Sequence, residues 1–322
     1  MCDVCFKVQT DPGRWITAVQ VRLNHVSHRR TFFHLEQLIL KHDAAVHCVG
    51  IKQIDQGRVE FVLPSESLAM DFVEFLAKVN PIKPDYVGTM SYDAESDIHK
   101  STLPVEICAV CPGDLISLPP EVAASLGYLG PVVICTKITD CIVLMEPVTI
   151  KHRLLDADQY WRSPLKTLFS SADLVRYVVV DIEPTFQKVS VDGSRYQLAD
   201  VIVDRRSDNY LEKDTPRKVR THLGHVLDIG MLVLGYAMSG KYKGLGLPDV
   251  VLIRKFRWKR EKPRTWELKR LVMEVDDSLR SSRGYEEKIE IEYEELLEEL
   301  EMNPDIWSQY SFYKNKYYQL AI

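Results

Sequence analysis

The sequence predicts an α+β multidomain protein: a small α/β domain, then an SH3-like and an OB-like β-barrel, and a charged helical C-terminal extension. Three observations carry this prediction. Helical and strand-like apolar patterns alternate over residues 14–97, short apolar runs with frequent Pro and Gly turns fill 98–255, and the last segment is rich in charge. The chain has 322 residues, 46% of them hydrophobic, which suffices for two or three domains with cores of their own.

The α/β domain is expected over residues 14–97, in the order β-α-β-β-α. Strands are recognised by alternating apolar residues and helices by apolar residues three or four apart. The expected elements are a strand over 15–23, a helix over 32–42 with Thr31 as its N-cap, a hairpin with its turn at 55–57, a helix after Ser65 and a polar linker over 83–101.

Two β-barrels are expected to follow this domain. Residues 98–150 contain short apolar runs separated by Pro- and Gly-containing turns, which is typical of a small barrel of SH3-like size. Residues 151–255 repeat this style with longer strands, after a helix expected at 171–176, and their strand number fits an OB-like barrel. Residues 256–322 have too little apolar content to close a core, so we expect a basic and then acidic extension.

Charge is distributed unevenly along this C-terminal part. Residues 254–266 carry seven Lys or Arg and one Glu, whereas residues 286–301 carry nine Glu and one Lys. The net charge of −5 for the whole chain conceals this difference. Such asymmetry predicts separate basic and acidic contact surfaces.

The basic run alternates cations with aromatic side chains. Cations neutralise phosphates and exposed rings stack on unpaired bases, so this pattern predicts an RNA-binding surface. A solvated basic tail or a nuclear-import signal is the alternative, with Lys259, Arg260, Lys262 and Arg264 as the import candidates. The expected RNA contacts in this run are Arg254, Lys255, Arg257, Trp258, Lys259 and Arg260, and Arg29 and Arg30 form a smaller basic group before the first helix.

His222 and His225 lie three residues apart in residues 221–225. No Cys or carboxylate pattern of metal-ligand spacing accompanies them, so we expect a structural or RNA-contact role rather than a catalytic metal. The chain also lacks a nucleophile elbow, a phosphate-binding Gly loop, an HExxH sequence and a dinucleotide-binding fingerprint. We therefore predict no catalytic residues and no enzymatic activity.

Two CxxC pairs, Cys2/Cys5 and Cys108/Cys111, supply the four thiolates that a structural zinc site needs. The alternative is that Cys108 and Cys111 are core thiols, and that Cys2 and Cys5 are half of a zinc ligand set. The other cysteines lie in or beside apolar runs and suit reduced thiols of the cytosol or nucleus. No secretory signal and no apolar run of membrane-spanning length occurs, so no membrane partner is expected.

Several stretches resemble the family of nuclear export adaptors for the 60S ribosomal subunit, and the last two are most similar to plant members. They occur in family order over nearly the whole chain. These stretches are residues 1–5, 26–33 continuing into 35–42, 156–161, 221–225, 248–253, 266–269 and 273–277.

The resemblance implies a shuttling adaptor of the nucleoplasm and the cytoplasm. Such an adaptor binds the nascent 60S subunit and its rRNA, links it to the leucine-rich-signal exportin with RanGTP, and is released by a cytoplasmic GTPase. Its two barrels are similar to those of translation factor five-A, without a counterpart of the hypusine lysine. No small-molecule substrate is implied.

The chain departs from the family pattern in three places. Family members carry an N-terminal zinc domain of several CxxC pairs, so residues 1–13 are expected to be its remnant, with zinc bound only if the missing pairs are present. Residues 227–231 read Leu-Asp-Ile-Gly-Met, where the family has Leu-Asn-Pro-Gly-Asp. The chain also ends before the acidic tail that bears the family's export signal, so the alternative is a truncated, ribosome-bound RNA-binding factor without export activity.

The acidic segment offers another candidate export signal. The four apolar residues Tyr293, Leu297, Leu300 and Met302 are spaced to share one helix face, which an exportin groove could receive. The alternative is an amphipathic helix that packs on its own protein.

Overall fold

The chain forms two compact units in the computed structural model, and the α+β multidomain class is confirmed. Unit 1 consists of Met1–Ala109, Pro263–Glu301 and Ile306–Ile322, and unit 2 of Val110–Lys262 and Met302–Asp305. Each unit is described by itself below. The structure describes residues 15–23, 29–94, 97–191, 194–206, 215–238, 248–256, 264, 266–275, 285–302 and 312–314.

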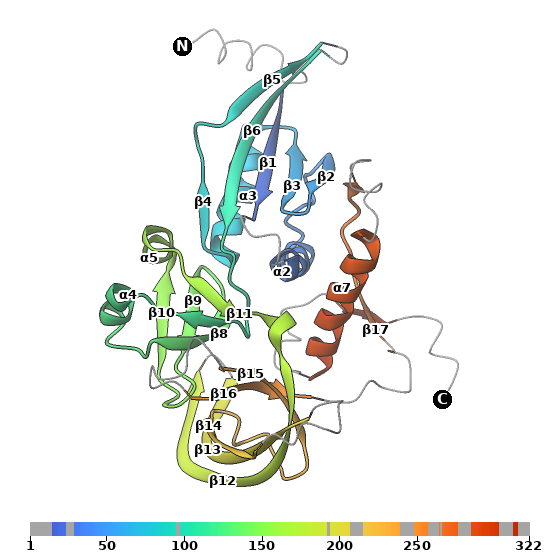
Figure 1. The fold of residues 1–322 in the computed structure, drawn as a ribbon. Helices are drawn as coiled ribbons and strands as arrows, with labels where there is room; N and C mark the ends of the chain where they lie inside the picture. Colours follow the sequence, from blue (N-terminus) through green and yellow to red (C-terminus); the bar gives the residue numbers. More distant parts are fainter. Residues whose placement is uncertain are drawn as a thin grey trace. The chain divides into compact units, whose positions relative to one another are not determined.

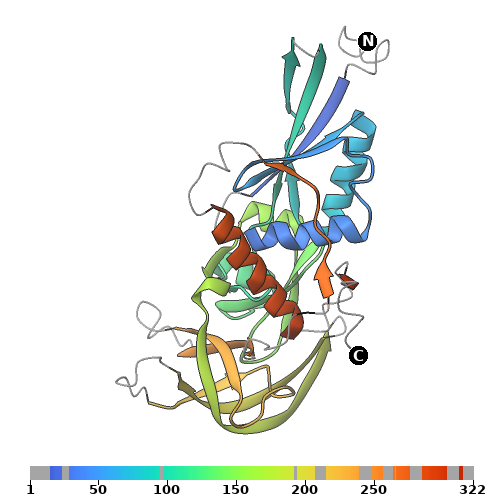
Figure 2. The ribbon, with the colours of Figure 1, turned by 90° about the vertical axis from the view of Figure 1, so that its right-hand side faces the viewer.

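Unit 1 is built on a mixed seven-stranded sheet (Figures 1 and 2). Its elements are β1 (Trp15–Arg22), α2 (Arg29–Lys41), β2 (Gly50–Asp55), β3 (Arg58–Leu63), α3 (Glu66–Val79), β4 (Ile82–Pro84), β5 (Thr89–Asp93), β6 (Ile98–Ile107), β17 (Trp266–Leu268), β18 (Glu274–Val275), α7 (Tyr285–Met302) and β19 (Phe312–Lys314). The strand order is β18-β2-β3-β1-β6-β4, and β5 pairs with β6 beside β4. The apolar faces of α2 and α3 share one core with β1, β3 and β6.

The expected strand, hairpin and two helices of this domain are confirmed. Ser65 caps α3 by accepting a hydrogen bond from the N–H of Leu68 at 3.4 Å. Gly57 is required in the hairpin turn, because a Cβ there would lie 2.7 Å from the carbonyl oxygen of Leu23. The expected N-cap Thr31 is wrong: α2 begins at Arg29, so Thr31 lies inside its first turn and is buried.

The expected linker over residues 83–101 contains strands instead. β4 and β5 pair in succession with β6, and β6 runs parallel to β1. Residues 98–107 therefore belong to the unit 1 sheet and not to the following barrel, where the sequence reading put them. The first half of β6 is only half-buried, so it lacks the apolar alternation by which strands are recognised.

The SH3-like part of unit 2 is a five-stranded antiparallel sheet in the order β10-β9-β8-β7-β11. It extends beyond the expected end at residue 150, because β10 and β11 lie after that residue. Its elements are β7 (Leu115–Ser117), α4 (Pro120–Ser125), β8 (Val132–Ile138), β9 (Cys141–Met145), β10 (His152–Asp156), α5 (Ala157–Arg162) and β11 (Lys166–Phe169). Asp156 and Gln159 form a reciprocal capping box that begins α5.

The OB-like part of unit 2 is a second antiparallel sheet in the order β14-β13-β12-β15-β16. The helix expected at 171–176 is a single 3-10 turn, since β12 already begins at Val175. β12 is one long strand whose register shifts between Pro184 and Lys188. Its elements are the 3-10 turn η3 (Ser171–Asp173), β12 (Val175–Val191), β13 (Ser194–Arg205), β14 (Arg217–Thr221), β15 (Leu232–Ala237) and β16 (Val250–Lys255).

The C-terminal segment was expected to be a separate extension, but its described elements belong to unit 1. β18 pairs in parallel with β2, and α7 packs on α2. Phe33 of α2 forms a small core with Trp266, Leu268, Leu296 and Leu300. In the part of the chain that the structure describes, no helix combines the length and apolar composition that crossing a bilayer requires.

Candidate nucleic-acid interface

Cations gather at one end of the OB-like barrel, where β12 and β14 begin and β13 and β16 end. Arg205 lies opposite Tyr177, Tyr177 lies opposite Val233, and Val233 lies opposite Lys255. Strand pairing thus makes one row across four strands, with a cation at each end. The cluster, called the basic end below, consists of Arg176, Arg205, Arg206, Arg217, Arg254 and Lys255.

An aromatic ring is part of the basic end. The guanidinium carbon of Arg176 lies 4.8 Å from the ring centroid of Phe256. The N–H of Phe256 donates to the carbonyl of Leu232 at 2.8 Å, and the N–H of Arg206 donates to the carbonyl of Arg176 at 3.0 Å. The pair is therefore held on hydrogen-bonded backbone. An arginine stacked on a ring offers a cation for phosphate beside a face for a base.

Two cations elsewhere on the same barrel are paired with carboxylates. Arg220 donates two hydrogen bonds to Asp200, at 2.8 and 3.0 Å, and holds the pKa of that carboxyl below its usual range. Lys218 lies 4.0 Å from Glu183. In the described residues, Arg176, Arg205 and Lys255 have no such carboxylate partner. These three cations of the basic end therefore keep their charge unneutralised, whereas Lys218 and Arg220 do not.

Only two members of the basic end, Arg254 and Lys255, were recognised from sequence. Of the other four, Arg205 and Arg206 lie at the end of β13, Arg176 near the start of β12 and Arg217 at the start of β14, and only the strand register brings these three strand ends together. The one sequence signal that could have revealed this cluster is a pair of polar residues at the end of an expected strand. The rest of the expected basic contacts and import candidates, Arg257, Trp258, Lys259, Arg260 and Lys262, lie outside the described residues.

The two histidines of residues 221–225 have different surroundings. His222 is buried, and burial together with nearby His225 and His152 lowers its pKa to about 3. A neutral, buried ring does not contact phosphate, so this geometry supports the structural role and not the RNA contact. His225 is exposed on the same turn and remains a predicted contact.

The first turn of α2 contains the other expected basic group. Arg29 is the first residue of the helix, and its side chain lies outside the described set. Arg30 is half-buried, and burial together with Arg30 lowers the pKa of His34 to about 3. The turn has no acidic residue. Cations at a helix N-terminus oppose the helix dipole but favour a bound anion, so phosphate contact here remains a prediction.

Arg264, the described import candidate, is bound to α7. Its Nε donates to Glu301 at 3.0 Å and its Nη1 to Glu294 at 2.9 Å. Partial burial lowers the pKa of Arg264, but these two carboxylates outweigh that effect and raise it. A guanidinium held by two carboxylates is not presented to an import receptor, which disfavours that role for Arg264.

The candidate export signal is part of the unit 1 core. Leu300 is fully buried, and Tyr293 and Leu297 pack against the same apolar cluster. Met302 ends α7, and its side chain is outside the described set. The guanidinium of Arg270 also lies 4.4 Å from the Tyr293 ring. The structure thus favours the alternative of a helix that packs on its own protein.

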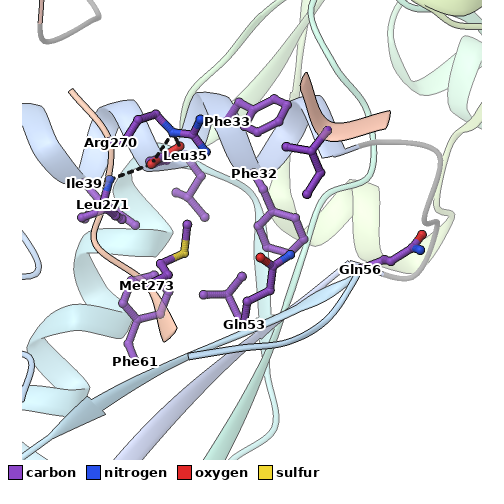
Figure 3. Close-up of a pocket in the computed structure, with 13 residues that line it drawn as sticks. Phe32, Phe33, Leu35, Ile39, Gln53, Gln56, Phe61, Arg270, Leu271 and Met273 are labelled. Carbon is purple, nitrogen blue, oxygen red and sulfur yellow. Dashed lines mark hydrogen bonds and ion pairs between the residues drawn. The ribbon is translucent and has the colours of Figure 1, made fainter. Parts of the chain in front are cut away.

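A cavity of about 70 Å³ lies between α2, the β2–β3 hairpin and residues 270–273 (Figure 3). Its walls are mainly apolar, including Phe32, Phe61 and Met273. Burial raises the pKa of Glu36 at its edge, against the opposing effect of Arg270. Glu36 accepts hydrogen bonds from Arg270 at 3.0 Å and from the N–H of Leu271 at 2.7 Å. These contacts attach residues 270–271 to α2. The described lining of the cavity offers no convergent acid, base or nucleophile.

Metal binding by the cysteines receives no support from the geometry. Cys2 and Cys5 lie outside the described residues. Cys108 and Cys111 are buried, and Cys111 donates its N–H to Asp114 at 2.9 Å. Within the described ranges, no three His, Cys, Asp or Glu side chains are grouped closely enough to hold a metal ion. The core-thiol alternative fits the burial of Cys108 and Cys111.

Three family models match the chain in succession. They are described as NMD3, second domain, over residues 14–107; NMD3 SH3 domain, over 110–158; and NMD3 OB-fold domain, over 174–255. The first model ends at the last residue of β6, which agrees with the placement of that strand in unit 1.

Curated relatives match almost the whole chain. The 60S ribosomal export protein NMD3 of Saccharomyces cerevisiae is 33% identical, over 98% of this chain and 63% of its own length. The proteins of the same name from Xenopus tropicalis and Dictyostelium discoideum are 34% and 33% identical, over 98% and 97% of this chain and 64% and 60% of their own lengths. The chain therefore spans a little under two thirds of these relatives.

The fold defines a protein of three small domains: a mixed α/β domain, an SH3-like barrel and an OB-like barrel. The three successive domain matches and the relatives identify the family within this class. The chain belongs to the NMD3 family.

Proposed function

We propose that this protein is a non-enzymatic adaptor that binds the nascent 60S ribosomal subunit during its export from the nucleus. The relatives' printed name, 60S ribosomal export protein, supports the export role. The basic end supports the binding role, because cations without a carboxylate partner among the described residues (Arg176, Arg205 and Lys255) beside the half-buried ring of Phe256 suit rRNA. This cluster is the observation that carries the proposal.

We further propose that the adaptor shuttles between nucleoplasm and cytoplasm, with the leucine-rich-signal exportin, RanGTP and a release GTPase as partners. The apolar face of α7 does not provide the export signal while it packs on α2, because Leu300 is fully buried there. Pull-down of exportin with RanGTP tests this part. The alternative, a ribosome-bound RNA-binding factor without export activity, is favoured if the chain cosediments with subunits but does not recruit exportin.

The test of subunit binding compares two double variants of equal charge. Arg176→Gln with Lys255→Gln removes two cations of the basic end. Lys218→Gln with Arg220→Gln removes two cations of the same barrel that face Glu183 and Asp200. Cosedimentation with purified large subunits is measured over a range of salt concentrations.

The first variant is expected to bind roughly tenfold more weakly at low salt. The slope of its logarithmic affinity against logarithmic salt concentration should decrease in magnitude by about 1 to 2, because each phosphate contact that is lost no longer releases counterions on binding. The second variant should keep the slope of the unaltered chain. An equal effect of the two variants would contradict the assignment of the basic end to rRNA.

A further inference from the structure

β5 forms an edge of the unit 1 sheet. It pairs with β6 along its whole length, from Thr89 opposite Thr102 to Asp93 opposite Ile98, and with no other strand among the described residues. β5 and β6 run beyond the ends of α2 and α3, so this part of the sheet stands clear of the helices of its own unit (Figure 1). An edge strand presents a row of N–H and C=O groups that can pair with a further chain.

The direction of these backbone groups follows from the pairing of β6. The carbonyl of Pro104 accepts a hydrogen bond from the chain between β4 and β5. Because backbone groups alternate in direction along a strand, Thr102 faces the same side and bonds to Thr89. The N–H and C=O of Met90 therefore point to the open edge.

Large apolar side chains are exposed along this edge. The exposed fractions are 68% for Tyr86, 92% for Val87, 56% for Met90 and 54% for Tyr92. Single exposed apolar residues are ordinary, but four within seven positions form a patch of the kind that marks an interaction site.

A row of stacked rings supports the patch across three strands. The ring of Trp15 lies 4.3 Å from that of His99, and the ring of His99 lies 4.7 Å from that of Tyr92. The hydroxyl of Tyr92 and Asp97 Oδ1 are 2.9 Å apart in a hydrogen bond. The Tyr92 side chain is thus held in one orientation, which lowers the entropy lost when a partner covers it.

The charge of this edge indicates the chemistry of its partner. Between Pro84 and Ile98 the sequence contains Asp85, Asp93, Glu95 and Asp97 and no Lys or Arg. Four acids repel the phosphates of RNA and attract lysine and arginine. Open backbone groups, moreover, are paired by a polypeptide and not by a nucleic acid.

We propose that β5 is the docking edge for an extended protein segment in which basic and apolar residues alternate. The segment adds a strand to the sheet by bonding to the outward N–H and C=O of Met90. Its apolar side chains cover the patch of Tyr86, Val87, Met90 and Tyr92, and its cations face the acids around the strand. This surface is separate from the basic end, so either assignment can fail without the other.

Fluorescence anisotropy of the full chain with a short labelled peptide of alternating lysine and valine tests the proposal. The control peptide has the same charge, with proline replacing alternate valines. It is expected to bind about tenfold more weakly, because proline cannot donate to a ladder and does not continue a strand. This comparison requires no variant of the protein.

Two substitutions then locate the site. Met90→Pro removes an outward N–H at an edge where proline is tolerated, and Met90→Thr keeps that N–H. Affinity for the lysine–valine peptide is expected to fall about tenfold in Met90→Pro and less than about threefold in Met90→Thr. Equal binding of the two peptides, or equal affinities of the two variants, overturns the proposal. It is likewise overturned if Tyr92→Ser weakens binding of a short oligouridylate and leaves peptide binding unchanged.

Discussion

Single residues of similar sequence character differ here either in burial or in the charged groups beside them. His222 and His225 are close in sequence, yet one is enclosed in unit 2 and the other faces solvent. Arg220 and Arg176 are both exposed cations of one barrel, yet only Arg220 is bound to a carboxylate. Sequence specifies the chemical groups, but their effective charge depends on neighbours that the strand register supplies.

The buried His222 predicts a pH dependence of stability. Its pKa is 6.5 in an exposed setting and about 3 in the fold, so the unfolded chain binds a proton below pH 6.5 that the folded chain does not. The free energy of unfolding therefore decreases as pH falls from 6.5 towards 3, by about 1.4 kcal/mol per pH unit for this residue. His34 adds a similar effect in unit 1.

Between pH 7 and pH 5, the free energy of unfolding of unit 2 should decrease by about 2 kcal/mol less in His222→Gln than in the unaltered chain. Urea unfolding at the two pH values measures this difference. His225→Gln is the matched control and should keep the full dependence. If His222→Gln also keeps it, the ring is not buried and neutral in solution.

At the scale of elements, the sequence predicted what local patterns specify. The hairpin around Gly57, the helix capped by Ser65 and the two barrels were recognised because their turns, caps and alternations lie within a few residues. The first half of β6 was missed because it shows no apolar alternation and is recognised only by its pairing with β1 and β5. The same reason applies to the basic end, whose members come from four strands.

The helix α7 was predicted as a helix, with an export signal or packing on its own protein as the two alternatives for its apolar face. Leu296 and Leu300 are fully buried in one cluster with Phe33, which favours the second alternative, but the sequence did not indicate the partner. Arg264 and Arg270 add contacts to Glu301 and Glu36 that no local pattern reveals. Phe33, the partner of α7 on α2, lies more than two hundred residues earlier in the chain, beyond the range of periodicity arguments.

Leu300→Ala is therefore expected to destabilise unit 1 by about 2 to 5 kcal/mol, as for other buried leucines. Ile291→Ala on the same helix is the matched control, because Ile291 is 56% exposed and should change stability by less than about 0.5 kcal/mol. Urea unfolding of the full-length variants measures both. Equal stability of the two variants would mean that α7 does not pack on α2 in solution.

At the scale of the whole molecule, unit 1 is assembled from parts of the chain that precede and follow the barrels in sequence. The chain leaves it after Ala109 and returns at Pro263. The returning part supplies a sheet strand through β18 and covers α2 through α7. Each unit has its own apolar core, with the two parts of unit 2 sharing Leu115, Tyr236 and Val251. The units should therefore respond separately to removal of the C-terminal segment.

A chain shortened to end at residue 262 tests this arrangement. In unit 1 it uncovers Phe33 and removes Arg270 and Leu271, which bond to the buried carboxylate of Glu36. Burial without a partner is costly for a carboxylate, so α2 should open and the amides of α2 should exchange hydrogen at least about tenfold faster. The amides of β12 and β13 in unit 2 should keep their exchange rates, because none of their bonding partners is removed. Hydrogen exchange measured by mass spectrometry compares the two regions in one sample, so β12 serves as the internal control for α2. Unchanged exchange in α2 would show that unit 1 folds without its returning segment, and equal acceleration in both regions would show that the two units are one cooperative body.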